Sequence, residues 1–171
     1  MRSGKRIQRV GLLIVSVFLS FIQVDSRAEQ TPSASVDVNL FASAVLPGGD
    51  SVTVGDRGKV FLSKEGAETW KEVESGTTRA LVTVCFPNDR HGWAAGQGGV
   101  ILHTGDGGRT WKIQPSGVEA YLLDIEFADP HHGVAVGADS TVVFTTDGGG
   151  TWLNAALGSS LDLTEEINLF A

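Results

Sequence analysis

The sequence predicts an all-β fold: a β-propeller of four-stranded antiparallel blades, of which about three are present. Its main support is a repeat of 41 residues that holds without a gap in five sets of positions: Gly55, Gly96 and Gly137; Trp70, Trp111 and Trp152; Ser63, Thr104 and Thr145; Leu40, Leu81 and Leu122; and Val45, Phe86 and Phe127. Each unit also contains four short strand signals separated by turn residues. Four short strands in a unit of about 40–45 residues are typical of a propeller blade, whereas β-solenoids normally use shorter repeats.

Residues 1–28 have the features of a secretory signal peptide. A basic start is followed by the apolar segment 10–24 and by small residues at 26–28. An apolar segment of about 15 residues is short against the roughly 20 that span a bilayer, so we favour cleavage over a membrane anchor. We therefore expect an exported protein that does not insert directly into a membrane after cleavage.

The charge and the cysteine content limit the partners and the redox chemistry. Removal of residues 1–28 leaves 8 Lys and Arg against 19 Asp and Glu, a net charge of −11. Such an acidic surface repels phosphate groups, which argues against nucleic acid and anionic membranes as partners. The only cysteine, Cys85, lies in an apolar run and cannot form an internal disulfide, so we expect it to be a small buried hydrophobic residue.

The domain organisation follows from the repeat. Residues 29–37 are polar and aperiodic and are predicted to form a flexible leader, and the blades occupy residues 38–171. The expected units are residues 39–76, 79–117 and 120–158, with residues 161–171 starting a fourth. The last assignment is made because the end of the chain, Ile167–Ala171, echoes Val38–Ala42 at the start of the first unit.

Each strand of a unit has its own signature. The first strand, 122–127 in the third unit, alternates apolar and acidic residues, the period of a half-buried strand. The second strand is built from small residues, which let neighbouring backbones come close, as in a tapering blade. The third is a short apolar run, and the fourth begins at each tryptophan. The expected strands are residues 52–55, 60–62 and 70–73; 81–86, 93–96, 100–103 and 111–114; and 122–127, 134–137, 142–145 and 152–155.

Three units and the start of a fourth do not make a complete ring, because a propeller usually needs about 4–8 blades to close. The open sheet faces and edges would be an aggregation liability. Two explanations follow. Either the chain is a piece of a longer gene product, which we favour, or it completes a ring by self-association.

A turn motif precedes the tryptophan of each unit. It matches the Asp-box, Ser/Thr-x-Asp-x-Gly-x-Thr-Trp, in the second and third units, and the first unit carries a degenerate copy with Glu65 in place of Asp. The motif residues are Ser63, Glu65, Thr69 and Trp70; Thr104, Asp106, Gly108, Thr110 and Trp111; and Thr145, Asp147, Gly149, Thr151 and Trp152. The hydroxyl and carboxylate can accept backbone N–H groups of their own turn, glycine supplies positive φ, and tryptophan fills the space beside the strands. We read the box as a structural hairpin lock and expect the first copy to be the loosest.

The box and the sequence before it resemble the photosystem II assembly and stability factor family. The residues that carry the resemblance are Gly92-Trp93-Ala94-Ala95-Gly96 and Gly98–Leu102 before Thr104, and it extends over about 40–156. It implies an exported, non-catalytic propeller that binds a protein partner, a nascent reaction-centre subunit, through an arginine-lined surface. For such a surface the mature chain offers Arg57, Arg79 and Arg90. The implied location is periplasmic, thylakoid-lumen-like or extracellular.

No catalytic, cofactor-binding or metal-binding residues are predicted. One aspartate per box falls short of the 6–8 oxygens that calcium takes, and His131-His132 falls short of a zinc site. Asp-boxes also occur in sialidases, but the arginine-containing motif that opens those enzymes is absent and Tyr121 is the only tyrosine. A fragment of a sialidase-like glycoside hydrolase and a cell-surface structural repeat protein remain the alternatives to a binding scaffold.

Overall fold

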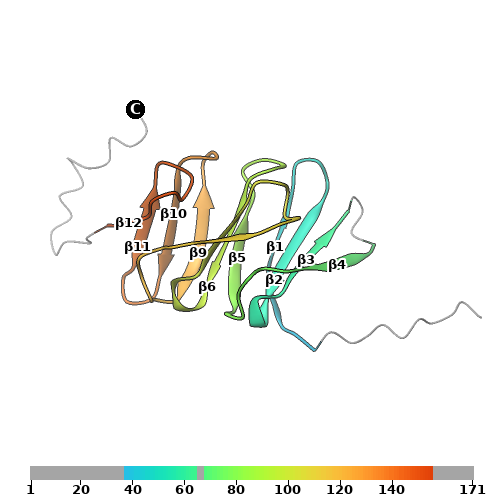
Figure 1. The fold of residues 1–171 in the computed structure, drawn as a ribbon, viewed down its shortest axis with the longest axis horizontal. Helices are drawn as coiled ribbons and strands as arrows, with labels where there is room; N and C mark the ends of the chain where they lie inside the picture. Colours follow the sequence, from blue (N-terminus) through green and yellow to red (C-terminus); the bar gives the residue numbers. More distant parts are fainter. Residues whose placement is uncertain (1–36, 65–67, 156–171) are drawn as a thin grey trace, which may run out of the picture. The chain divides into compact units, whose positions relative to one another are not determined.

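The computed structural model describes residues 37–64 and 68–155 (Figure 1). All described residues belong to the second of the two units into which the chain divides, residues 36–171. The predicted signal peptide, most of the predicted leader, the tip of the first Asp-box at 65–67 and the predicted fourth unit lie outside the described residues.

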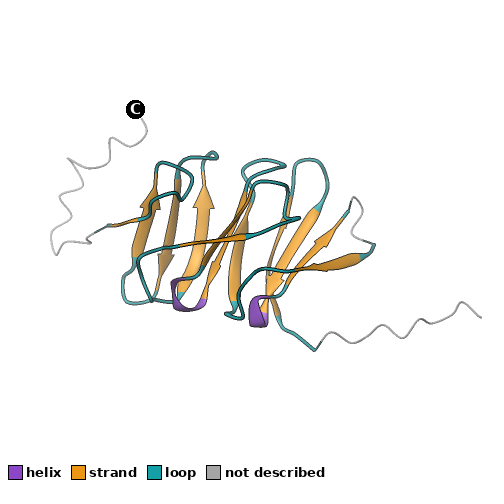
Figure 2. Ribbon diagram, viewed as in Figure 1, coloured by secondary structure: helices purple, strands orange, loops and turns teal. Residues whose placement is uncertain are grey.

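The described residues form three four-stranded antiparallel sheets, and each sheet keeps its strands in sequence order (Figure 2). The first blade contains β1 Leu40–Val45, β2 Ser51–Gly55, β3 Val60–Ser63 and β4 Trp70–Val73. The second contains β5 Leu81–Cys85, β6 Gly92–Gly96, β7 Ile101–Thr104 and β8 Lys112–Gln114. The third contains β9 Leu122–Phe127, β10 Gly133–Gly137, β11 Val142–Thr145 and β12 Leu153–Asn154. The predicted strands agree with these bounds to within one or two residues.

Local irregularities repeat with the same period. The pairing of the first and second strands shifts register at the start of each blade, between Leu40 and Ala42, Leu81 and Thr83, and at the Gly137–Leu122 pair. After the second strand of each blade the chain turns tightly. A residue with positive φ lies two positions after the glycine that ends this strand, which is Gly55, Gly96 or Gly137. These residues are Arg57, Gly98 and Asp139, with φ of 55°, 66° and 56°. The repeat thus fixes backbone conformation as well as strand length.

The core lies between the sheets. β5 contacts β1 and β2, and β9 contacts β5 and β6, so the first strand of each later blade packs against the first two strands of the blade before it. The cluster between the first and second blades comprises Leu46, Val52, Val54, Val60, Leu62, Leu81, Ala94, Val100, Leu102 and Trp111. The cluster between the second and third comprises Cys85, Trp93, Ala95, Ile101, Leu122, Ile125, Phe127, Ala135, Val143 and Trp152.

Trp93 is the largest fully buried side chain and sits in the second of these clusters. Its ring stacks on Phe127 of the third blade, with centroids 3.5 Å apart, and lies 4.7 Å from His103 of its own blade. Its Nε1 is buried without a hydrogen-bond partner among the described residues. The neighbouring Cys85 is buried too, and burial, reinforced by Glu126, raises the pKa of its thiol to about 12. The cysteine therefore behaves as a packing residue.

Hydrogen bonds between blades join equivalent positions of the repeat. The Gly48 N–H donates to Asp89 Oδ1 at 2.5 Å, and the Thr83 hydroxyl donates to Asp124 Oδ1 at 3.1 Å. Each bond connects a residue to the one 41 positions further along. Successive blades are therefore held in the same relative register.

Candidate partner-binding cavity and the Asp-box turns

The Asp-box of the second blade is a closed network of hydrogen bonds. Thr104 Oγ1 donates to Asp106 Oδ1 at 2.8 Å and accepts the Gly108 N–H at 3.0 Å. Asp106 Oδ1 also accepts the N–H groups of Arg109 and Thr110, and Oδ2 accepts the Thr110 hydroxyl. Both carboxylate oxygens are thereby used within the turn. This arrangement locks the hairpin, as the structural interpretation of the box predicts.

The third blade repeats the network, and the same bonds shift the pKa of both carboxyl groups. Thr145 Oγ1 donates to Asp147 Oδ1 at 2.8 Å, and the Thr151 N–H donates to the same oxygen at 2.9 Å. The Thr151 and Thr145 hydrogen bonds lower the pKa of Asp147. Partial burial opposes ionisation of Asp106, but hydrogen bonds from Thr110 and Thr104 lower its pKa as well. Both turns are built around a charged carboxylate.

The first box differs from the other two in its described residues. Ser63 Oγ donates to the Thr69 carbonyl oxygen at 2.6 Å, a bond that closes the hairpin from its base. Trp70 is exposed, whereas Trp111 and Trp152 are buried in the two inter-blade clusters. Glu65 lies outside the described residues, so the predicted looseness of this hairpin stays a prediction.

The three candidate arginines do not lie together. Arg57 lies in the 3-10 turn Asp56–Gly58 after β2, and Arg79 precedes β5, so both are at the edge of the blades where the first strands begin. Arg90 lies in the β5–β6 turn at the opposite edge, where its carbonyl accepts the Gly107 N–H of the Asp-box. A single surface can therefore include Arg57 and Arg79 but not Arg90.

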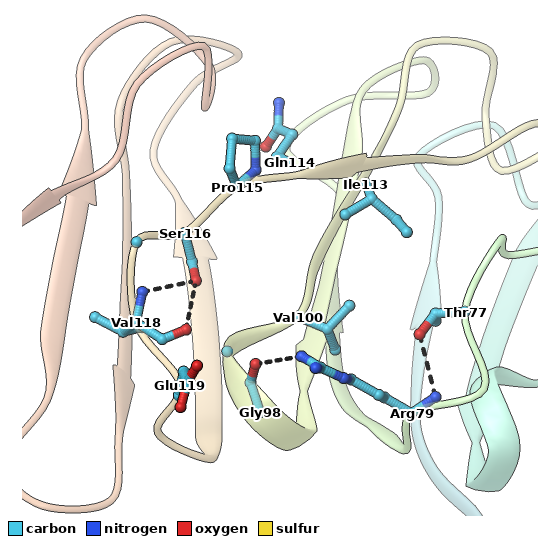
Figure 3. Close-up of a pocket in the computed structure, with 12 residues that line it drawn as sticks. Thr77, Arg79, Gly98, Val100, Ile113, Gln114, Pro115, Ser116, Val118 and Glu119 are labelled. Carbon is cyan, nitrogen blue, oxygen red and sulfur yellow. Dashed lines mark hydrogen bonds between the residues drawn. The ribbon is translucent and has the colours of Figure 1, made fainter.

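Arg79 lines a cavity of about 520 Å³ on the second blade (Figure 3). Three segments far apart in the sequence form its wall: the β4–β5 linker, the 3-10 turn Gln97–Gly99, and the end of β8 with the linker to β9. The lining residues are Thr77, Arg79, Gly98, Gly99, Val100, Ile113, Gln114, Pro115, Ser116, Gly117, Val118 and Glu119. The cavity is open, shallow and of mixed polarity, which suits a segment of polypeptide better than a compact metabolite.

The linkers that frame the cavity are held by one repeated turn. Ser75 Oγ bonds the carbonyl and the N–H of Thr77, and Ser116 Oγ bonds those of Val118. At Gly99, where φ is +70°, a Cβ would lie 1.9 Å from the Val118 carbonyl oxygen. Glycine is therefore required for the 3-10 turn to approach the linker.

The cavity combines one guanidinium with apolar surface. Arg79 Nη1 donates to the Gly98 carbonyl oxygen at 2.6 Å, and Figure 3 shows the side chain extended toward Gly98. Within the described ranges no carboxylate forms an ion pair with Arg79, so its remaining N–H donors are available to a ligand. Ile113 lines the same cavity and is exposed. The cavity thus offers a group for an anionic ligand and an apolar side chain within one lining.

Sequence reasoning identified Arg79 but missed Ile113 and the linkers. The equivalent positions of the first and third units are Glu72 and Asn154, so Ile113 departs from the repeat. A single exposed apolar side chain is common on protein surfaces, and this departure becomes informative only because Ile113 lines the cavity. The linkers do not depart from the repeat in this way. Ser75-Gly76 and Ser116-Gly117 are equivalent in the two units, so the sequence does not indicate that one of them borders a cavity.

His91, His131 and His132 lie in turns, and His103 lies on β7. The Asp129 carboxylate accepts the backbone N–H groups of His131 and His132. Its Oδ2 also bonds the His132 side chain at Nδ1, at 2.8 Å. This side-chain bond is the main reason that the pKa of Asp129 falls to about 2. His91 Nδ1 lies 3.3 Å from His103 Nε2, and burial, then His91, lowers the pKa of His103. Within residues 37–64 and 68–155, no group of three or more His, Cys, Asp or Glu side chains could hold a metal ion, and no helix there is long and apolar enough to cross a membrane.

Comparison with known proteins connects the fold to a family. The family model described as photosynthesis system II assembly factor YCF48 matches residues 62–117 and 111–170. Two solved structures resemble the chain, each with a TM-score of 0.61: YCF48 bound to D1 peptide, at 19% identity, and YCF48 from Cyanidioschyzon merolae, at 23%. Each match covers 68% of this chain and 39% of the solved one, so the chain spans about two fifths of the length of those structures. The predicted fold, blades of an incomplete β-propeller, is confirmed. No curated protein matches.

Proposed function

Because this chain belongs to the family of the photosynthesis system II assembly factor YCF48, we propose that it is a non-catalytic, exported assembly factor that binds a protein partner. The partner would present a segment of polypeptide to the cavity of the second blade. Non-catalytic binding agrees with the carboxylates of Asp106 and Asp147, which accept hydrogen bonds within their own turns.

The single observation that carries this proposal is the presence of both Arg79 and Ile113 in the lining of one open cavity. The guanidinium would bind a carboxylate of the partner, a side chain or the C-terminus, through the N–H donors that Gly98 leaves unused. Ile113, with Val100 and Pro115, would contact an apolar side chain nearby. A peptide is supported as the ligand because one solved member of the family is bound to a D1 peptide.

Binding of a synthetic D1 peptide to the full chain, followed by fluorescence anisotropy, tests this proposal. We expect Arg79→Ala to weaken binding about 10-fold or more, because a charge-assisted hydrogen bond is lost. Ile113→Glu should also weaken binding by placing a negative charge against the carboxylate. The matched control is Arg57→Ala, which removes an arginine from the same edge outside the cavity.

Equal losses for Arg57→Ala and Arg79→Ala would show that binding depends on net charge and would contradict the cavity as the site. No binding by the unchanged chain would contradict the proposed ligand. Export is tested separately: the protein purified from its host should begin at Glu29, whereas retention of Met1 would contradict cleavage.

A further inference from the structure

We propose that the cavity of the second blade is selective for a polypeptide segment that carries one acidic, one apolar and one basic side chain. The inference rests on the proposed function, because it specifies the chemistry of the segment that this cavity would bind. Arg79 calls for the acidic group, and Val100 and Ile113 call for the apolar one. The basic group follows from Glu119, which lines the same cavity.

Two of the 12 lining residues are charged, and their charges are opposite. Arg79 belongs to the linker between β4 and β5, and Glu119 belongs to the linker between β8 and β9. In the view of Figure 3, Gly98 lies between the two side chains, and Val100 and Ile113 lie above Arg79. One lining therefore offers a cation, an anion and an apolar pair.

Both charges are available to a ligand. The guanidinium of Arg79 donates one N–H group to the Gly98 carbonyl oxygen, and an arginine has five such donors. In the described part of the chain, neither Arg79 nor Glu119 forms an ion pair with any residue or with each other. Both residues are exposed. A segment with an acidic and a basic side chain can therefore satisfy two charges that the fold leaves unpaired.

The apolar pair comes from adjacent strands. Val100 immediately precedes β7, Ile113 lies in β8, and the two strands pair with each other. The corresponding residues of the first blade are Lys59 and Glu72, which form an ion pair. The first blade thus has two charges that neutralise each other where the second has two apolar side chains. Val100 is 6% exposed and Ile113 is 56% exposed, so Ile113 provides most of the apolar surface that a ligand can contact.

The charged pair occurs at its two positions in the second unit only. The first and third units have no charged residue at either position. The residues there are Val38 and Thr78 in the first unit and Ala120 and Ser160 in the third. A preference for a ligand with both charges would therefore report on the cavity of the second blade.

The net charge of the chain predicts a different preference. The chain carries a charge of −7, which by itself favours the most basic ligand at any surface. The cavity favours a ligand with one charge of each sign, because a second basic group would meet Arg79 and a second acidic group would meet Glu119. Ligands that differ only in their charges can thus separate local selection from the field of the whole molecule.

Three sets of short synthetic peptides with capped ends measure the preference by fluorescence anisotropy with the full chain at low salt. Each peptide has a leucine between two charged residues, which are an aspartate and a lysine, two aspartates or two lysines. Zero, one or two glycines separate the leucine from its neighbours. At the best spacing we expect the mixed peptide to bind about 3-fold or more tightly than either of the others. The preference should shrink as salt is added, since both groups are exposed.

Two variants should change the preference in opposite directions. Glu119→Lys should favour the peptides with two aspartates, and Arg79→Glu should favour those with two lysines. The matched control is Glu74→Lys, which makes the same change of charge at an exposed residue of the β4–β5 linker outside the cavity and should keep the preference for the mixed peptides. Circular dichroism verifies the fold of each variant. If Arg79→Glu does not fold, the comparison of Glu119→Lys with Glu74→Lys decides.

The outcomes separate this inference from the proposed function. Equal changes in Glu119→Lys and Glu74→Lys would show that net charge selects the ligand and would overturn the inference. Equal binding of the three peptide sets, or binding of the D1 peptide without any of the short ones, would overturn the inference and leave the proposed function standing. Binding of none of these peptides, the D1 peptide included, would overturn both.

Discussion

Trp70 and Trp111 occupy the same position of the repeat and have opposite environments. Both follow an Asp-box turn, but Trp111 is 8% exposed and Trp70 is 45% exposed. Trp111 reaches the valines of the first blade, and among the described residues no blade precedes Trp70. The box therefore shapes its own hairpin through local hydrogen bonds, while burial of its tryptophan depends on the neighbouring blade.

The largest expected effect separates these two tryptophans. Trp111→Ala should lower the free energy of unfolding by roughly 3–5 kcal/mol, because it removes a large buried ring and leaves a cavity. Trp70→Ala should lower it by less than half as much, because this ring is 45% exposed. Urea denaturation followed by circular dichroism measures both. Equal losses would show that the box, and not the adjacent blade, sets the energetic importance of the tryptophan.

The next effect concerns the close approach of a box to the preceding blade. Gly108 has a φ of +82°, and a Cβ there would lie 2.8 Å from Val52 Cγ2. Gly108→Ala should therefore destabilise the protein by about 1–3 kcal/mol. Gly105→Ala in the same turn is the control, because the nearest atom to its Cβ would be 4.0 Å away. Thermal unfolding distinguishes the two, and equal melting temperatures would contradict the close contact.

The hydrogen bonds that Asp106 accepts within its own turn should make the stability of the protein depend on pH in the acid range. The folded pKa of Asp106 lies below the ordinary value of 3.8, so its contribution is present above that pH and is lost as the pH falls through the folded pKa. Asp106→Asn should lower stability at pH 7 and flatten the decline below about pH 4. Asp139→Asn, outside the boxes, serves as the control. An unchanged acid profile in Asp106→Asn would contradict the role of the charged carboxylate.

The smallest expected effect is at the surface of the first blade. Lys64 Nζ pairs with Asp50 Oδ2 at 2.9 Å, and the lysine side chain is mostly exposed. Lys64→Ala should lower the free energy of unfolding by roughly 0.2–1 kcal/mol at low salt, and the difference should shrink as salt is added. A larger loss that is independent of salt would mean that the first hairpin relies on this contact.

The repeat allowed the fold to be predicted to within a residue or two of each strand. The 41-residue period could be read from Trp70, Trp111 and Trp152 alone, because a buried ring and a tight turn constrain their positions strongly. The cavity was not predictable in this way. Arg79, Gly98 and Ile113 meet only after two linkers and a 3-10 turn have folded, and a period relates equivalent residues without showing which distant ones touch.

The sequence also did not predict that equivalent residues of the first and third blades differ in exposure. Val52 and Val134 are identical residues at equivalent positions, yet one is fully buried and the other is 40% exposed. Among the described residues, Val52 faces a following blade and Val134 does not. A sequence period alone does not show which copies of a repeated position pack against another blade.

The bonds from Gly48 to Asp89 and from Thr83 to Asp124 also restrict how such a gene can change. Each joins a residue to its own counterpart, so a one-residue insertion within a strand would move one partner and turn alternate side chains to the opposite face. Duplication or deletion of a whole unit, in contrast, leaves the strand register of every remaining blade unchanged. The molecule should therefore tolerate the gain or loss of 41 residues better than the gain or loss of one.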